Sequence, residues 1–469
     1  MSGGLLVERL RQFLRDLSPD ARNLLMTELE RGLLRGEETP GAELVLQELR
    51  RDAREHARPK RPGNLSRLFF QPLEPFLVDD SATHNHPGRI ARVILEPVWD
   101  WICRDLMPGE AKAVTDQVAL AFDNGEPKRA EQLARAFQDR TAVRMEEALA
   151  AAHADERLKR RLTGQINTPR ALTDIASILT IIKSRDVLAT FGSKLPGHIK
   201  VFDGAPVVEV KELIDSPVAG GSKLFVYTLV MTMSRLAAPW QLIRLATRAA
   251  GSDHASRIAE GPYSAAVEIV FAEIERMTGE LKAELRTGRG LATGALLKGI
   301  HDAARGMRSE INLTHDSPWS RRLAALRTQV SDLLKNEIES LTGRVRRLLR
   351  PRPIKEIAPH STIDINEVGD TEALIEFVKT CRVYANELAV NELTSRTWSD
   401  LQHYLDTTTP SLVENLRNAG ESDRAFRQSQ LDAAVRFCAK VFGQEYASLL
   451  LKSGEVAVAS EQKKLAAKA

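Results

Sequence analysis

Apolar residues recur every three or four positions along most of the chain, which is the spacing of one face of an α-helix. The longest such stripe lies within residues 318–349 and consists of Leu323, Leu326, Val330, Leu334, Ile338, Leu341, Val345 and Leu348. Its steps of 3, 4, 4, 4, 3, 4 and 3 do not sustain a regular supercoil. The pattern therefore predicts a helix that packs within this protein or against one partner helix.

Helix starts are marked by a Ser or Thr directly before a Pro. The hydroxyl accepts hydrogen bonds from the unpaired N–H groups of the first turn, and the fixed φ of proline suits the first helical position. Helix-forming residues follow five of these pairs, so we expect helices to begin at Ser18-Pro19, Thr39-Pro40, Thr168-Pro169, Ser317-Pro318 and Thr409-Pro410.

Only one stretch of the sequence contains segments typical of β-strands. Residues 196–222 are rich in Gly and Pro, and they contain two β-like pieces, His198–Phe202 and Val207–Val210, on either side of Asp203-Gly204. That dipeptide favours a turn, so the sequence predicts at most a small β-hairpin near residues 198–210. No repeat of 30 to 45 residues is visible, which disfavours a regular helical array. The expected fold is all-α, either irregular multi-helix bundles or an α-superhelix.

Linkers rich in Pro, Gly or basic residues suggest how the chain is divided. We predict an N-terminal three-helix unit (1–57), a basic linker (58–66), a segment with an aromatic and proline-rich hub and long helices (67–195), a Gly/Pro-rich connector (196–222), a central helical bundle (223–350), a second linker (351–369), a C-terminal helical unit (370–452) and a disordered tail (453–469).

Charge and cysteine content exclude several classes of protein. The net charge is +3 and the sequence pI is about 8.7, so no overall basic field calls for nucleic acid or an anionic membrane as partner. The three cysteines are far apart, which is typical of reduced thiols.

The most apolar run, residues 224–233, is too short for a membrane span and predicts a buried helix. We expect a cytoplasmic protein, with peripheral membrane association as an alternative.

The hub contains the only close grouping of histidines and carboxylates: Asp79, Asp80, His84 and His86. Imidazole and carboxylate groups bind divalent metals, and an open coordination position would permit metal-assisted hydrolysis. The competing interpretation is a surface loop, because Asp, Asn, Ser and Thr are also turn residues. We favour the loop and expect no cofactor, with a divalent metal as the alternative.

Two basic patches share an Arg-Pro pattern. The first contains Arg58, Lys60 and Arg61, and the second contains Arg344, Arg346, Arg347, Arg350 and Arg352. The guanidinium fork suits phosphates of lipid or nucleic acid, and it also suits acidic surfaces of a protein partner. Cations at a helix C-terminus are also favoured by the helix dipole, which gives a purely structural reason for them.

Trp99 and Trp101 are two residues apart and point to different faces of a helix, so one could pack in the core while the other is an interface anchor. We favour the alternative in which both pack in the core. Together these patterns favour a non-catalytic helical interaction or scaffold protein that binds a protein partner through helical faces and Arg-Pro patches. The alternatives are a metal-dependent hydrolase at the Asp79 to His86 loop, and nucleic-acid or anionic-membrane binding through the basic patches.

Overall fold

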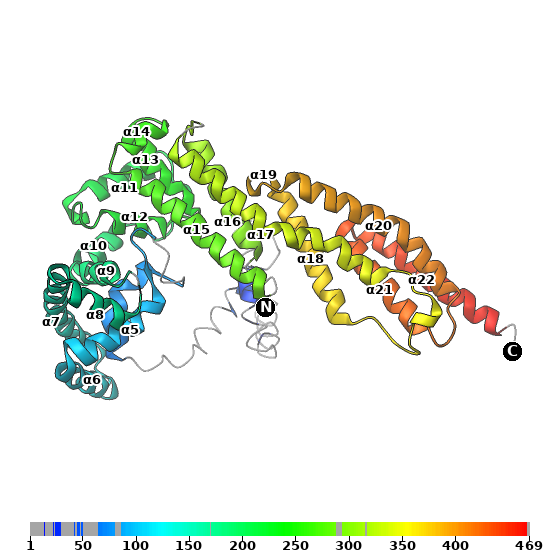
Figure 1. Cartoon of the computed structure of the whole chain (residues 1–469), viewed down its shortest axis with the longest axis horizontal. Helices are drawn as coiled ribbons and strands as arrows, with labels where there is room; N and C mark the ends of the chain where they lie inside the picture. The colour runs from blue at the N-terminus through cyan, green and yellow to red at the C-terminus, as the bar shows by residue number, and fades with distance from the viewer. Residues whose placement is uncertain are drawn as a thin grey trace, which may run out of the picture. The chain divides into compact units, whose positions relative to one another are not determined.

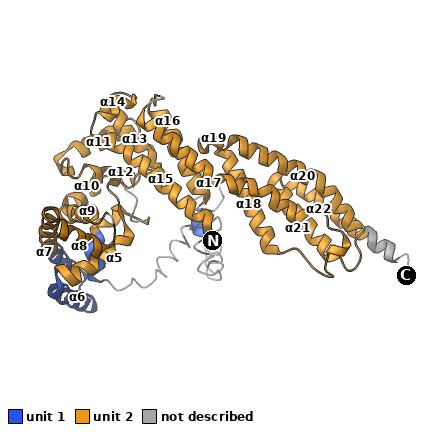
Figure 2. Cartoon of the chain, viewed as in Figure 1, with its two compact units in different colours: residues 1–71, 107–138 blue, residues 72–106, 139–469 orange. Residues whose placement is uncertain are grey.

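The fold is all-α, as the helical periodicity predicted (Figure 1). The computed structural model describes residues 64–79, 86–168, 170–287, 293–314 and 317–466, with scattered helical positions between residues 14 and 49. The chain divides into two compact units (Figure 2). Unit 1 comprises residues 1–71 and 107–138, and unit 2 comprises residues 72–106 and 139–469. The predicted division into eight segments stays a prediction.

Unit 1 is held by the aromatic side chains of α4. It contains α4 (Leu65–Phe70), α6 (Pro108–Asp123) and the first part of α7 (Pro127–Ala154). Phe69 is fully buried, and its ring centroid lies 5.8 Å from that of Phe137 on α7. The Gln138 side-chain amide donates hydrogen bonds to the carbonyls of Leu68 and Phe69 at 3.1 and 2.8 Å. These contacts join α4 to α7.

The hub is the aromatic and proline-rich stretch of residues 67–108. Its part between residues 71 and 106 contains a small sheet that the sequence pattern did not predict. Leu77 pairs with Ile90 and Val78 with Ala91 in a parallel arrangement. The elements are η1 (Gln71–Phe76), β1 (Leu77–Val78), β2 (Ile90–Ala91), η2 (Arg92–Ile94), α5 (Leu95–Trp101) and the π-helical turn η3 (Ile102–Leu106).

The hub packs on two helices of unit 2. The Phe76 ring meets Tyr227 of α12 edge to face at 5.3 Å. Gly88, with φ +69°, lies so close to α12 that an added Cβ would be 2.8 Å from Val226 Cγ1. The Glu273 carboxylate on α15 attracts the half-buried Arg89 side chain, which also donates to the Pro75 carbonyl at 3.0 Å.

The central part of unit 2 is helical, in agreement with the all-α prediction. Its elements are α8 (Glu156–Ile166), α9 (Ala171–Lys183), α10 (Arg185–Lys194), α11 (Ala205–Asp215), η4 (Pro217–Ala219), α12 (Phe225–Met233), η5 (Pro239–Leu242), α13 (Ile243–Ala250), α14 (Ala255–Ala259), α15 (Ser264–Thr287) and α16 (Thr293–Glu310). The apolar run at residues 224–233 is largely a buried helix, as predicted.

The sequence allowed at most a small β-hairpin near residues 198–210, and no hairpin forms there. Residues 205–215 form α11, and Ile199 makes only an isolated bridge to Leu236. Val207, Val210 and Ile214 are buried on one face of that helix. Their spacing of three and four fits a helix, and burial of the face decides the conformation over the β-propensity of valine.

The C-terminal helices of unit 2 pack around the apolar stripe of α17 (Pro318–Leu349). All residues predicted to form this stripe are buried. The other elements are η6 (Ile354–Glu356), α18 (Ile365–Val383), α19 (Ala385–Leu388), α20 (Asn391–Arg417), α21 (Arg424–Val441) and α22 (Gln444–Ala466). α22 continues through most of residues 453–469, where disorder was expected, because Gly454 and Ala457 are buried and Gly454 lies against Leu431 of α21.

Candidate functional site

Two of the four predicted metal ligands lie in the described part of the chain, in different surroundings. The Asp79 side chain is 80% exposed and accepts a hydrogen bond from Arg92 Nε at 2.9 Å. His86 is only 6% exposed and interacts electrostatically with Glu273 of α15. Asp80 and His84 lie outside the described residues. Among the residues described, no group of three or more His, Cys, Asp or Glu side chains could hold a metal.

Charged side chains of opposite sign lie together where the hub packs on α15. Burial would raise the pKa of Glu273, but hydrogen bonds from Arg276 at 2.6 and 3.0 Å and the nearby Arg89 lower it below its usual value. Desolvation lowers the pKa of Arg89. This arrangement stabilises ionised Glu273, whose charge attracts Arg89 of the hub.

The cysteine thiols are poor nucleophiles at neutral pH. Burial raises the pKa of Cys438 to about 12, with a further contribution from Asp406. Burial also raises the pKa of Cys381 and of half-buried Cys103. Because the thiolate is the reactive form, these environments suppress thiol chemistry.

Trp99 and Trp101 differ in exposure, as expected for residues two apart on a helix. Trp101 is 4% exposed and belongs to the core, while Trp99 is half-buried. The role of Trp99 as an interface anchor stays a prediction.

The second Arg-Pro patch lies at the end of α17. Arg347 and Arg350 pair with Glu367 and Glu356 at 3.3 and 3.0 Å, on the surface. We call the set Arg344, Arg346, Arg347, Arg350 and Arg352 the arginine surface. The other basic patch, Arg58, Lys60 and Arg61, lies outside the described residues.

The arginine surface also contains side chains whose charge no described carboxylate neutralises. The Arg346 guanidinium lies 5.4 Å from the Tyr404 ring centroid, and Arg352 lies 5.1 Å from the ring centroid of Phe426. Arg344 is half-buried and, within the described residues, makes no ion pair. Stacking on an aromatic ring holds a guanidinium in place and leaves its charge available to a partner.

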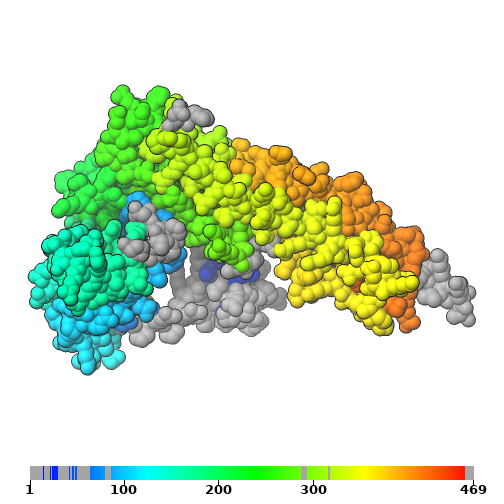
Figure 3. All heavy atoms as spheres, viewed as in Figure 1, coloured from blue at the N-terminus to red at the C-terminus, as the bar shows by residue number. Residues whose placement is uncertain are grey.

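Exposed isoleucines flank the arginine surface. Ile354 is 63% exposed and Ile365 is 72% exposed. Because Arg347 pairs with Glu367, the last turn of α17 lies beside the first turn of α18, which begins at Ile365. In the space-filling view, the yellow region around residue 350 lies open on the visible face (Figure 3). Cations and apolar side chains therefore share one end of the C-terminal helices.

The segment that connects α17 to α18 is fastened to α21. The Gln430 amide donates to the carbonyls of Leu348 and Arg350 at 3.1 and 3.0 Å. Arg427 donates to the Arg352 carbonyl at 2.6 Å, and Ser429 accepts from the Ile363 N–H at 3.0 Å. These bonds give the exposed isoleucines a fixed support.

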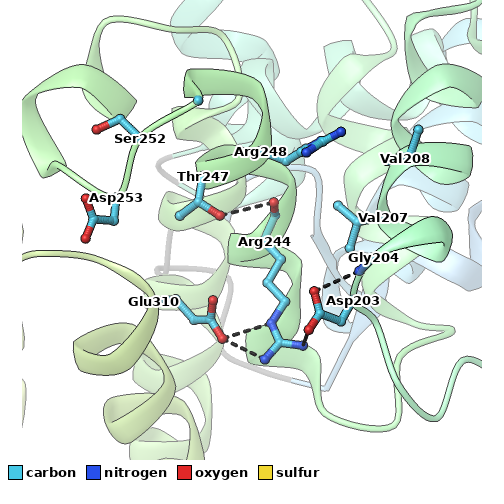
Figure 4. A pocket seen from close by; sticks show the side chains of 11 residues that line it. Asp203, Gly204, Val207, Val208, Arg244, Thr247, Arg248, Ser252, Asp253 and Glu310 are labelled. Carbon is cyan, nitrogen blue, oxygen red and sulfur yellow. Dashed lines mark hydrogen bonds and ion pairs between the residues drawn. The ribbon is translucent and has the colours of Figure 1, made fainter.

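A cavity of about 710 Å³ lies over α13 and was missed by the sequence analysis (Figure 4). The floor is one face of α13, which presents Arg244, Thr247 and Arg248 at spacings of three and four. The walls are the start of α11, the turn after α13 and the end of α16; the full lining is Asp203, Gly204, Val207, Val208, Arg244, Thr247, Arg248, Gly251, Ser252, Asp253 and Glu310. The one signal in the sequence was the like-charged pair Arg244 and Arg248, four residues apart on one helix.

Of the two arginines on the cavity floor, Arg244 is neutralised within the protein. Arg244 pairs with Glu310 at 2.7 Å, donates to the Phe202 carbonyl at 3.0 Å and stacks near Trp240 at 5.4 Å. Asp203 accepts from the Gly204 N–H at 2.7 Å and lies 3.9 Å from Arg244. Arg244 therefore acts as a structural link between α13, α16 and the chain before α11.

Comparison with protein-family models, with curated proteins and with solved structures gives no match to this chain. Among the described helices, none combines the length and the apolarity needed to cross a membrane.

Proposed function

We propose that this protein is a non-catalytic interaction or scaffold protein that holds a protein partner at the arginine surface. One observation carries the proposal: cations without an acidic partner among the described residues, Arg344 and Arg346, lie in the same region as Ile354 and Ile365, which are 63% and 72% exposed. A partner with acidic and apolar residues would complement both features.

Favourable solvation explains why the arginine side chains are exposed, but it does not explain why the isoleucine side chains are exposed. Burying an isoleucine side chain fully stabilises by roughly 1.5–3 kcal/mol, so two that lie open are an available source of binding energy. Arginine is also enriched in protein interfaces. The connecting segment is already held by Gln430 and Arg427, so little conformational entropy is lost when a partner binds.

The test is affinity capture with the full chain, quantified by mass spectrometry, from a lysate of the cells that make it. The test variants are Arg344→Glu with Arg346→Glu, and separately Ile354→Ser with Ile365→Ser. We expect each pair to lose the same captured protein. The matched control is Arg257→Glu with Arg305→Glu, two exposed arginines of α14 and α16 that should leave capture unchanged.

Salt and nuclease treatment separate a protein partner from the alternatives. Binding through these cations should weaken as ionic strength rises. Capture of the same protein by both pairs of variants would contradict the proposal. Loss of capture after nuclease treatment would also contradict it, because the arginines would then be binding the phosphates of a nucleic acid.

A further inference from the structure

Two charged side chains in the cavity over α13 have no ion-pair partner among the described residues. Arg248 and Asp253 both line it, both are exposed, and neither pairs with any residue in the described ranges. Arg244 and Glu310, in contrast, neutralise each other. The cavity therefore offers one guanidinium and one carboxylate, and Arg248 extends toward α11 while Asp253 lies on the other side of the α13 face (Figure 4).

Hydrogen bonds fix both walls of the cavity. On one side, the Phe202 N–H donates to the Gln241 side chain at 3.2 Å, and the Phe202 carbonyl accepts from Arg244. On the other side, the Asn312 N–H donates to the Asp253 carbonyl at 2.8 Å. The volume of about 710 Å³ lies within the range of roughly 300–1,000 Å³ typical of small-molecule sites. A ligand would meet a preformed site with a low ordering cost.

The balance of charge selects the class of ligand. Two arginines and three carboxylates line the cavity, which gives a net charge of −1, so a polyanion is disfavoured. A single anion would satisfy Arg248 alone, and a single cation would satisfy Asp253 alone. A molecule with both charges satisfies both, and Val207 and Val208 supply an apolar wall.

We propose that this cavity binds a short zwitterionic peptide, with its carboxylate on Arg248 and its ammonium group toward Asp253. The guanidinium fork binds a carboxylate through two parallel hydrogen bonds, and the apolar wall receives a side chain. This site is independent of the arginine surface, because it lies on α11, α13 and α16.

Calorimetric titration of the full chain with the dipeptide leucyl-leucine tests the ligand class. We expect the dipeptide to bind, and its N-acetylated and C-amidated forms to bind at least roughly tenfold more weakly, because each loses one charge-assisted pair. Inorganic phosphate should bind far more weakly than the dipeptide. No binding of leucyl-leucine at millimolar concentration, or equal binding of phosphate, would overturn the proposal.

Substitutions of Arg248 and Asp253, whose side chains are exposed, test the role of each residue in binding. Arg248→Gln and Asp253→Asn should each weaken leucyl-leucine binding by roughly tenfold or more, and Arg257→Gln on α14 should leave it unchanged. Equal affinity of Arg248→Gln and the unaltered chain would refute the assignment. The blocked dipeptides repeat the test on the unaltered chain, so the result does not depend on how a variant folds.

Discussion

The packing of the hub on α12 depends on Gly88. Replacing Gly88 with alanine adds a Cβ 2.8 Å from Val226 Cγ1, 3.0 Å from Val230 Cγ2 and 3.3 Å from the Val226 carbonyl. The residue also has φ +69°, in the left-handed region that side chains disfavour. Two costs therefore add: about 1–2 kcal/mol for the backbone conformation and about 1–3 kcal/mol for overpacking. We expect Gly88→Ala to lower the free energy of unfolding by about 2–5 kcal/mol.

Gly221→Ala separates the two costs. Gly221 has φ +74° in the same unit, but among the described residues, apart from its chain neighbours, no atom lies within 4 Å of its added Cβ. This control should lose only the backbone cost, about 1–2 kcal/mol. Adding Val226→Ala to Gly88→Ala should relieve the closest contact, so the double variant should lose less than the sum of the single losses.

Urea unfolding followed by circular dichroism measures these differences, with the slope of the transition compared between variants because the chain has two units. If Gly88→Ala costs no more than Gly221→Ala, the close approach to α12 adds no overpacking cost, which would refute the prediction.

The ionised Glu273 under the hub predicts a pH effect. Its folded pKa lies below the usual 4.5, so its contribution is fully present above about pH 4.5 and is lost as the pH falls through the folded pKa. Glu273→Gln should therefore lower the urea midpoint at pH 7 and do so less at pH 3, and an equal loss at both would contradict this account. Buried Cys438, with a pKa of about 12, should react with iodoacetamide at pH 7.5 far more slowly in the folded chain than in urea, as mass spectrometry can follow. Equal reaction rates in the folded chain and in urea would show that the Cys438 thiol is accessible in the folded chain.

Helix starts illustrate how far local rules reach. At Ser317-Pro318 the prediction is confirmed: α17 begins there, and the Ser317 hydroxyl accepts from the Ser320 N–H at 3.1 Å. At Thr409-Pro410 it is wrong, because Pro410 lies inside α20. Buried Leu405 and Leu412 on either side keep the helix packed against its neighbours, and that burial outweighs one missing backbone hydrogen bond. Ser18, Thr39 and Pro169 lie outside the described residues.

Candidate sites were harder to predict than helices. The arginine surface was visible in the sequence as an Arg-Pro run, and Ile365 was not, because its exposure follows from how α18 meets α17. The cavity over α13 joins Arg244 to Glu310, which is 66 residues away in the chain. No local pattern specifies such a pair.

The sequence by itself determined the all-α class and the buried stripe of α17, because helical periodicity is a local property of the chain. Only the tertiary structure decided that residues 205–215 are helical and that β1 and β2 pair in parallel. It also decided that Arg244 pairs with Glu310, while Arg248 has no ion-pair partner among the described residues. These outcomes depend on which distant side chains compete for the same burial and the same charge, and that competition is settled only when the helices pack.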